Sequence, residues 1–163
     1  MKGKKLLVSL LAAVVLVAVM VTPVMAATGT EITGTVPKAI EVSAPANFAM
    51  PELSPAATQP ITSANQTATI NANHTGWTLT VVDSDADGKM EASGPVYLTN
   101  AMLVKGGDET TYTSLASAVT LKSAGAAGTG QTITDISFQQ TVSWGDAAGA
   151  YSITVTFTAT PGS

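Results

Sequence analysis

The stretch that decides the fold is Tyr151-Ser152-Ile153-Thr154-Val155-Thr156-Phe157-Thr158-Ala159, in which apolar residues alternate with Ser and Thr. A period of two places the apolar side chains on one face of a β-strand and the hydroxyl side chains on the other. The preceding run alternates in the same way, with Ile136, Phe138, Val142 and Trp144 in one phase and Gln140 between them. The turn 145–149 that joins the two runs has Gly at both ends, so we predict that they form a β-hairpin.

Alternation continues through the rest of the chain after residue 26. Trp77-Thr78-Leu79-Thr80-Val81 is a third clear strand, and weaker strands are predicted at 31–36, 39–44, 67–71, 96–98, 101–104 and 118–122. No segment here has a sustained helical period, although residues 113–119 could form one helical turn. We therefore predict a single antiparallel β-sandwich, Ig-like or jelly-roll-like, with about eight or nine strands over residues 37–163. Its inward-pointing residues are expected to be Trp77, Phe138, Val142, Trp144, Ile153, Val155 and Phe157.

Residues 1–26 have the three parts of a secretory signal peptide. Lys2, Lys4 and Lys5 precede an apolar run over residues 6–21, and small residues stand at Val24 and Ala26. The alternative is a retained N-terminal anchor helix, since the apolar run is almost long enough to span a membrane. Pro23 breaks the helix where the small residues begin, which favours cleavage. We expect an extracellular or cell-surface protein with no stable membrane span after cleavage.

Composition excludes several functions for the chain after residue 26. It has 4 Lys and no Arg against 11 acidic residues, a net charge of −7, which does not suit a nucleic-acid partner. There is no Cys, and His74 is the one His, so thiol catalysis, disulfides and Cys- or His-based metal sites are excluded. No group of residues has the spacing of a catalytic set, so we expect a non-enzymatic protein. The one cofactor that we consider is calcium, at the site described next.

A candidate calcium site lies at Asp83-Ser84-Asp85-Ala86-Asp87-Gly88-Lys89-Met90-Glu91. Carboxylates at alternate positions before a Gly match the first half of an EF-hand loop. Asp83, Asp85 and Asp87 would bind the ion, with the Lys89 carbonyl and Glu91 completing the shell, although Gly94 stands where the bidentate Glu belongs. The alternative is a solvated acidic turn, where Asp and Gly are favoured for backbone reasons.

Two further kinds of site are present. Asn65 and Asn73 each begin a glycosylation sequon, whose use would depend on the host. Trp77 and Trp144 are candidates for stacking on sugar rings, but both are in phase with aliphatic neighbours, which favours a role in the core.

Part of the sequence resembles the WxL-type surface domains. The resemblance is carried by Gly76-Trp77-Thr78-Leu79 in its strand and by the C-terminal alternating hairpin, and its pieces lie at 76–83, 87–90, 98–102 and 137–159. It implies a secreted, non-catalytic β-sandwich associated with the cell surface. The last strand departs from the pattern, because Phe157-Thr158-Ala159 stands where those domains have a second Trp-x-Leu.

Two functions fit these observations. The first is a structural protein of the cell surface, a subunit of a fibre, pilus-like filament or sheath, that polymerises with itself by β-strand addition. Residues 27–36 would be the added strand, with Thr30, Ile32, Thr33 and Val36 as assembly residues; alternatively, 31–36 is an edge strand of its own domain. The second function is a WxL-like module that binds a cell-wall polymer or polysaccharide, and an exposed aromatic platform would support it.

Overall fold

The computed structural model describes residues 32–162, and the chain divides into two units, residues 1–35 and 36–163. The predicted signal peptide lies outside the described residues. In the first unit, the described residues 32–35 form no strand. In the second unit, which we call the domain, every strand ladder is antiparallel, and residues 32–162 contain no helix, so the predicted antiparallel all-β class is confirmed. Within these residues no helix could cross a membrane.

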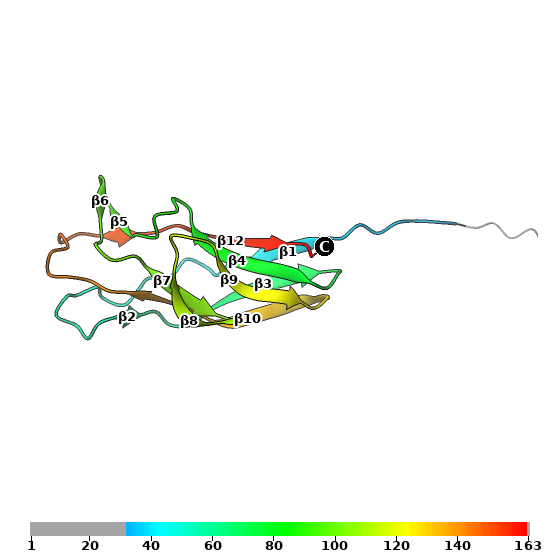
Figure 1. Ribbon diagram of the computed structural model, residues 1–163, viewed down its shortest axis with the longest axis horizontal. Helices are drawn as coiled ribbons and strands as arrows, with labels where there is room; N and C mark the ends of the chain where they lie inside the picture. The colour runs from blue at the N-terminus through cyan, green and yellow to red at the C-terminus, as the bar shows by residue number, and fades with distance from the viewer. Residues whose placement is uncertain (1–31, 163) are drawn as a thin grey trace, which may run out of the picture. The chain divides into compact units, whose positions relative to one another are not determined.

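The domain has two larger sheets and one small one (Figure 1). The first sheet has the order β1 (Ile40–Ser43), β3 (Gln66–Ala72), β10 (Gly128–Gln140), β7 (Leu103–Gly106) and β8 (Glu109–Ser114), and β2 (Ile61–Thr62) pairs with the end of β10. The second has the order β12 (Val155–Thr160), β4 (Trp77–Asp83) and β9 (Val119–Gly125). The small sheet has the order β11 (Tyr151–Ser152), β5 (Glu91–Ala92) and β6 (Val96–Tyr97).

The two larger sheets share one hydrophobic core. The alternation seen in the sequence places every second residue of β4 and of the second half of β3 inside, because successive side chains of a strand point to opposite faces. The most deeply buried large side chains come from both sheets and include Ile70, Leu79, Val81, Val104, Leu121, Ile136 and Phe138. This shared core is the arrangement expected of a β-sandwich.

Trp77 is the largest fully buried side chain, and its position depends on Gly125. The two residues are partners across the β4–β9 ladder, and the indole lies where a β-carbon on Gly125 would be. The indole N–H donates a hydrogen bond of 2.7 Å to the carbonyl of Ala126, so the ring's one polar group is satisfied. This contact fixes β9 against the central strand of the second sheet.

The predicted hairpin between the last two alternating runs is wrong. β10 pairs with strands of the first sheet and β12 pairs with β4 in the second, so the connection 141–154 crosses from one sheet to the other. A period of two specifies which face of a strand is buried, but it does not identify the neighbouring strand.

Three further sequence predictions also need correction. Trp144 is 81% exposed, because β10 ends at Gln140 and its alternation does not extend to the turn that follows. The described part of the predicted strand 31–36 forms no strand. Residues 113–119 form the end of β8, a turn and the start of β9, with no helical turn.

The other predictions of buried residues and strands fare better. Trp77, Phe138 and Val142 are buried, whereas Ile153, Val155 and Phe157 pack against the core but are only half-buried. The strands predicted at 39–44, 67–71, 96–98, 101–104 and 118–122 each overlap an observed strand, and β2, β5 and β8 were not predicted.

The contact between Trp77 and Gly125 generates a stability prediction. Gly125→Ala should lower the free energy of unfolding by about 1–3 kcal/mol, because the added methyl group overlaps the buried indole. Gly145→Ala is the matched control: no atom lies within 4 Å of its added methyl group, so the change should stay within about 0.5 kcal/mol. Urea unfolding followed by tryptophan fluorescence measures both. Equal stability of the two variants would contradict the packing described here.

Candidate functional site

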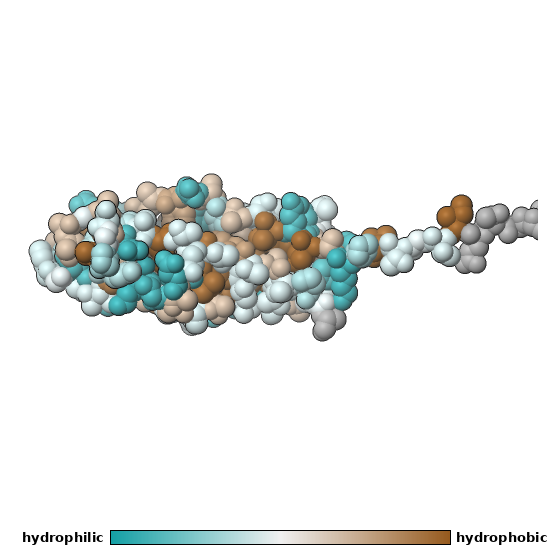
Figure 2. Space-filling model, turned by 90° about the horizontal axis from the view of Figure 1, so that it is seen from above, coloured by the Kyte–Doolittle hydropathy of each residue, from teal (hydrophilic) through white to brown (hydrophobic). Residues whose placement is uncertain are grey.

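The core of the domain is incompletely covered on one side. Among residues 32–162, the apolar side chains that pack against it while staying half-buried lie in two stretches of chain, residues 40–53 and 151–159. They are Ile40, Val42, Met50, Leu53, Tyr151, Ile153, Val155, Phe157 and Ala159. Seen from the side on which Figure 1 draws β1 and β12, the surface of the domain shows brown, hydrophobic residues among polar ones (Figure 2). We call this the open side of the domain.

A groove of about 1100 Å³ lies on the open side. One wall is the chain segment 44–55, and the other is formed by residues of the stretch 144–157. The floor consists of core side chains, namely Met90, Leu98, Met102, Phe138 and Val142. The groove therefore reaches the hydrophobic core directly.

The first wall is a stretch of chain without strand partners. Residues 44–50 follow β1 but belong to no strand, and the backbone groups of 44–51 have no hydrogen-bond partner among the described residues. Phe48 holds the wall to the floor, since its ring lies 5.3 Å from that of Phe138 between centroids. Pro45 and Pro51 have no amide hydrogen, which prevents this stretch from continuing as a regular ladder.

The second wall begins with a braced turn that carries Trp144. Asp146 accepts hydrogen bonds from the Ser143 amide at 2.7 Å, and from the Thr99 amide and hydroxyl at 2.8 and 2.6 Å. Asn100 donates to the Thr141 carbonyl at 3.2 Å. These hydrogen bonds fix the conformation of the turn, and the side chain of Trp144 on this turn is exposed to solvent.

The remainder of the second wall includes the first half of β12, an edge strand. β12 pairs only with β4, so among the described residues no ladder occupies the other edge of its backbone, although β1 lies close to part of it. Its apolar residues Val155 and Phe157 face the groove, and the intervening Thr156 is exposed. An unpaired edge next to half-buried apolar side chains is a site where a further strand can add.

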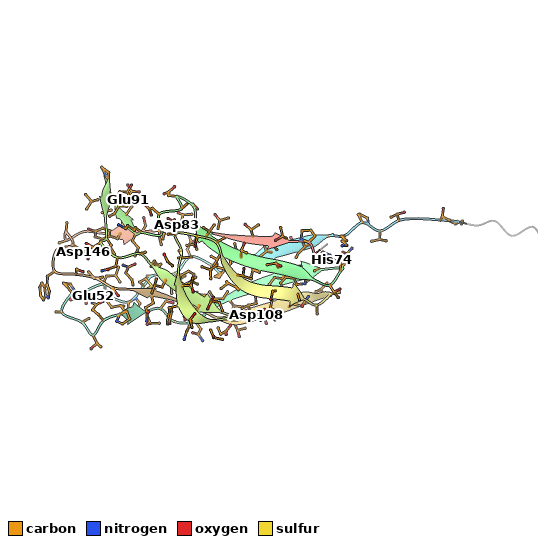
Figure 3. All side chains as sticks on the ribbon, viewed as in Figure 1. Glu52, His74, Asp83, Glu91, Asp108 and Asp146 are labelled. Atoms are coloured by element: carbon orange, nitrogen blue, oxygen red, sulfur yellow. The ribbon has the colours of Figure 1, made fainter. Side chains whose placement is uncertain are left out.

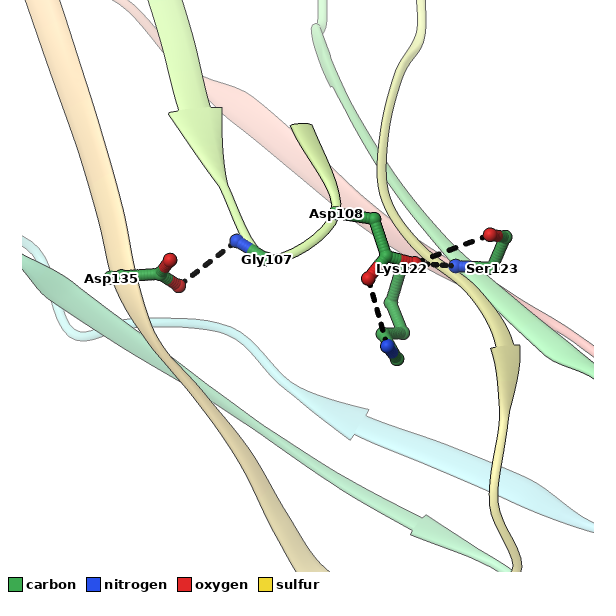
Figure 4. Close-up of polar contacts among 5 residues, drawn as sticks. All are labelled: Gly107, Asp108, Lys122, Ser123 and Asp135. Atoms are coloured by element: carbon green, nitrogen blue, oxygen red, sulfur yellow. Dashed lines mark hydrogen bonds and ion pairs between the residues drawn. The ribbon is translucent and has the colours of Figure 1, made fainter. Parts of the chain in front are cut away.

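The opposite side of the domain, between β8 and β9, is closed. Leu115, Val119 and Leu121 are fully buried there. The Asp108 amide donates to the Leu121 carbonyl, and its carboxylate accepts hydrogen bonds from Lys122 at 2.8 Å and from Ser123 (Figure 4). The bond from Lys122, followed by that from Ser123, lowers the pKa of the Asp108 carboxyl.

The predicted calcium site folds as an acidic turn between β4 and β5. Asp83 is buried and accepts a hydrogen bond from the Gly88 amide at 3.0 Å, and Asp87 accepts one from the Lys89 amide at 2.7 Å. In residues 32–162 no group of three or more carboxylates or imidazoles lies close enough together to hold a metal ion. Calcium binding therefore stays a prediction from the sequence.

The exposed carboxylates of this turn lie on the surface near the hairpin of β5 and β6. Glu91, and then Asp87 and Asp85, raise the pKa of the exposed Tyr97 hydroxyl by their negative charge. Asp83 is buried, and Asp83, Asp85 and Glu91 line one hollow, but within residues 32–162 they do not form a group close enough to hold a metal ion. The geometry matches the alternative of a solvated turn more closely than it matches a metal centre.

The two sequons occupy different environments. Asn65 is exposed between β2 and β3, and its amide makes no hydrogen bond to described residues. Asn73 donates from its side-chain amide to the Pro37 carbonyl at 2.8 Å and accepts from the Ala39 amide at 2.8 Å. Its nitrogen therefore already fixes the chain that leads into β1, a role that the sequon gave no reason to expect.

The predicted assembly residues are only partly described. Ile32, Thr33 and Val36 are exposed and lie in no strand, and Ile32 and Val36 are 92% and 84% exposed. Thr30 lies outside the described residues.

The groove itself was not predicted from the sequence. The prolines of residues 44–55 indicate that this stretch forms no regular strand. They do not indicate which core residues the stretch leaves uncovered. Comparison with known proteins adds no assignment: no family model matches the sequence, and neither the curated proteins nor the solved structures contain a similar chain. The WxL-like resemblance stays a prediction.

The braced turn generates a pH-dependent prediction. The Thr99 hydroxyl first, and then the Ser143 and Thr99 amides, lower the pKa of the Asp146 carboxyl from its ordinary 3.8. A lowered pKa means that the ionised form stabilises the fold above pH 3.8, and that this stability is lost as the pH falls through the lowered value. Asp146→Asn should cost roughly 1 kcal/mol at neutral pH and progressively less in acid.

Thermal melts of both proteins between pH 7 and pH 2 measure this difference. Thr99→Val removes one donor to the same carboxylate and should show part of the effect. A difference between Asp146→Asn and the unmodified protein that stays constant over the whole range would contradict the role of the carboxylate.

Proposed function

We propose that the protein is a non-enzymatic, secreted structural protein of the cell surface that self-assembles by β-strand addition. The added strand is the segment 27–36, which cleavage after residue 26 leaves at the N-terminus. The product is a fibre, a pilus-like filament or a sheath subunit, and the partner of each copy is another copy.

The observation that carries the proposal is the state of residues 32–36. Ile32 and Val36 are almost fully exposed in a stretch of chain that forms no strand. Burying one such β-branched side chain is worth about 1.5–3 kcal/mol, and a stretch rich in Thr and Val suits a pleated sheet. Pro37 then stops the ladder, because it has no amide hydrogen to donate. The segment is thus suited to pairing with another chain.

Deleting residues 27–36 from the secreted form should abolish high-mass species while leaving a folded monomer. The reason is that an added strand is needed for polymerisation and is dispensable within its own domain. Size-exclusion chromatography and negative-stain microscopy measure assembly, and circular dichroism with a thermal melt measures folding. Polymers that persist without the segment would place the joint elsewhere, and an unfolded truncated domain would make the segment an internal strand.

A double substitution supplies the matched control in the full-length secreted form. Ile32→Asp with Val36→Asp should prevent assembly, because both charges fall on the face that must be buried. Gly29→Asp with Thr35→Asp adds the same charge to the other face and should leave assembly largely intact. The same loss in both variants would show that charge, and not the apolar face, controls assembly.

A second candidate function is supported by Trp144. An exposed aromatic ring on a braced turn is the platform expected of a module that binds a cell-wall polymer or polysaccharide. Since the side chain is 81% exposed, Trp144→Ala should change stability by less than about 1 kcal/mol.

Co-sedimentation with insoluble wall glycans tests this candidate. Trp144→Ala should reduce the bound fraction at least tenfold, and Trp144→Phe should retain part of it. If the alanine variant sediments as well as the unmodified protein, the ring does not bind glycan.

A further inference from the structure

We propose that the groove on the open side is the acceptor site for the segment 27–36 of a second copy of this chain. This assignment rests on the proposed self-assembly and adds to it the place where the strand docks and the polarity of the joint.

The first argument is the position of the uncovered core. The half-buried apolar side chains lie along residues 40–53 and 151–159, and the groove opens between parts of these two stretches. On the other side of the domain, Leu115, Val119 and Leu121 are fully covered. Among the described residues, the half-buried apolar side chains that pack against the core are therefore confined to the open side.

The second argument is the backbone of the two walls. β12 forms a ladder on one side only, as β9 does, and β1 lies close to part of its other edge. What distinguishes the groove is its other wall, because residues 44–51 make no backbone hydrogen bond to the described chain. A strand placed between them would find hydrogen-bonding groups on the β12 edge and apolar contacts on the floor. The wall from Tyr151 to Phe157 would span about 23 Å as a strand, and the segment 27–36 spans about 33 Å at the usual rise per residue. The segment is long enough to cover it.

The third argument is the match of side-chain faces. In an extended segment Ile32, Gly34 and Val36 share one face, because side chains alternate. Glu31 falls on the opposite face, toward water. This matters because the charged residues that line the groove, Glu52 and Asp146, are both acidic.

The fourth argument is polarity. Pro37 and Ala39, which lead into β1, are held by the side chain of Asn73, and Lys38 donates to the Gly162 carbonyl at 2.8 Å. Within the domain, the neighbouring His74 lies at one end, whereas Glu52 and Asp146 of the groove lie toward the other (Figure 3). Pro37, which follows the segment in the chain, is therefore held at the end of the domain away from the groove. A joint between such different surfaces is heterologous, and repeating it gives an open, head-to-tail filament.

Disulfide trapping tests the acceptor site cleanly, since the chain has no cysteine of its own. One secreted-form protein carries Thr33→Cys on the outward face of the segment. A second carries Thr156→Cys or Thr158→Cys on the exposed face of β12, together with Ile32→Asp and Val36→Asp, so that it can only accept a strand. A third replaces the β12 cysteine by Thr120→Cys, an exposed threonine on β9 at the closed side.

We expect the first and second proteins, mixed under mild oxidation, to form a disulfide-linked dimer at least tenfold more than the first and third. Equal cross-linking to β9 and β12 would overturn the acceptor assignment. The acceptor assignment would also be overturned if the unmodified protein polymerises but neither β12 position forms a cross-link. In that case the proposed self-assembly would still stand. Absence of both polymer and dimer would overturn both.

A synthetic peptide of residues 27–36 provides a measurement that does not depend on polymerisation. Added to the Ile32→Asp, Val36→Asp protein, it should raise the melting temperature saturably, by about 5 °C when the peptide is well above its dissociation constant. The same peptide carrying Ile32→Asp and Val36→Asp should have no effect. If the unmodified peptide at millimolar concentration causes no shift in melting temperature, the assignment is overturned. It is also overturned if the groove of each monomer is already filled by the N-terminal segment of that same monomer.

Discussion

The contact between the Trp77 indole and the bare α-carbon of Gly125 holds the second sheet together. β4 is the central strand of that sheet, and Trp77 lies at its first position, directly opposite Gly125 of β9. β12 is attached to the sheet only through β4. The edge strand that borders the groove is therefore positioned by the strand that carries this buried ring. A side chain at residue 125 would displace the ring, and the change would be transmitted across β4 to the groove.

The domain is built asymmetrically around its core. On the closed side, the turn after β7 is tied to β9 by Asp108 and to β10 by Asp135, whose carboxylate accepts from the Gly107 amide at 2.9 Å (Figure 4). Neither side has a ladder that joins its two edge strands, β8 and β9 on the closed side and β1 and β12 on the open side. The open side differs in that its apolar side chains stay half-buried. The Asp108–Lys122 pair is too exposed to add much stability, but its geometry fixes the turn. The two sides therefore differ in how completely they cover the core, which is fully covered next to β9 and half-covered next to β12.

The sequence predicts this fold wherever the alternation is uninterrupted. Trp77, Leu79 and Val81 are buried as their phase requires, and β12 is found where the last run predicts it. The same pattern could not assign partners, so β10 and β12 were joined in a hairpin although they belong to different sheets. It also could not show that β10 ends before Trp144, because the alternation of residue types continues beyond the strand.

The candidate site was harder to predict than the fold. The groove exists because the irregular segment 44–55 leaves core side chains uncovered. No local sequence pattern indicates which core side chains a distant segment fails to cover. The acidic residues 83–91 have the spacing of half a calcium loop, but the first of them turns inward to bind the Gly88 amide. The prediction that residues 27–36 add as a strand rests on their composition and on Pro37, both of which are local features, and it stays a prediction.

The attachment at Asn73 has a mechanical consequence. A load carried by the N-terminal segment enters the domain at Pro37, where the Asn73 amide binds the carbonyl, and passes at once into β1. β1 is paired with β3 over its whole length, from Ile40 opposite Ala72 to Ser43 opposite Thr69. Tension along the strand axis therefore loads these hydrogen bonds in shear and together, instead of opening them one after another. A chain of such domains would resist extension far better than it resists peeling at right angles to the strand.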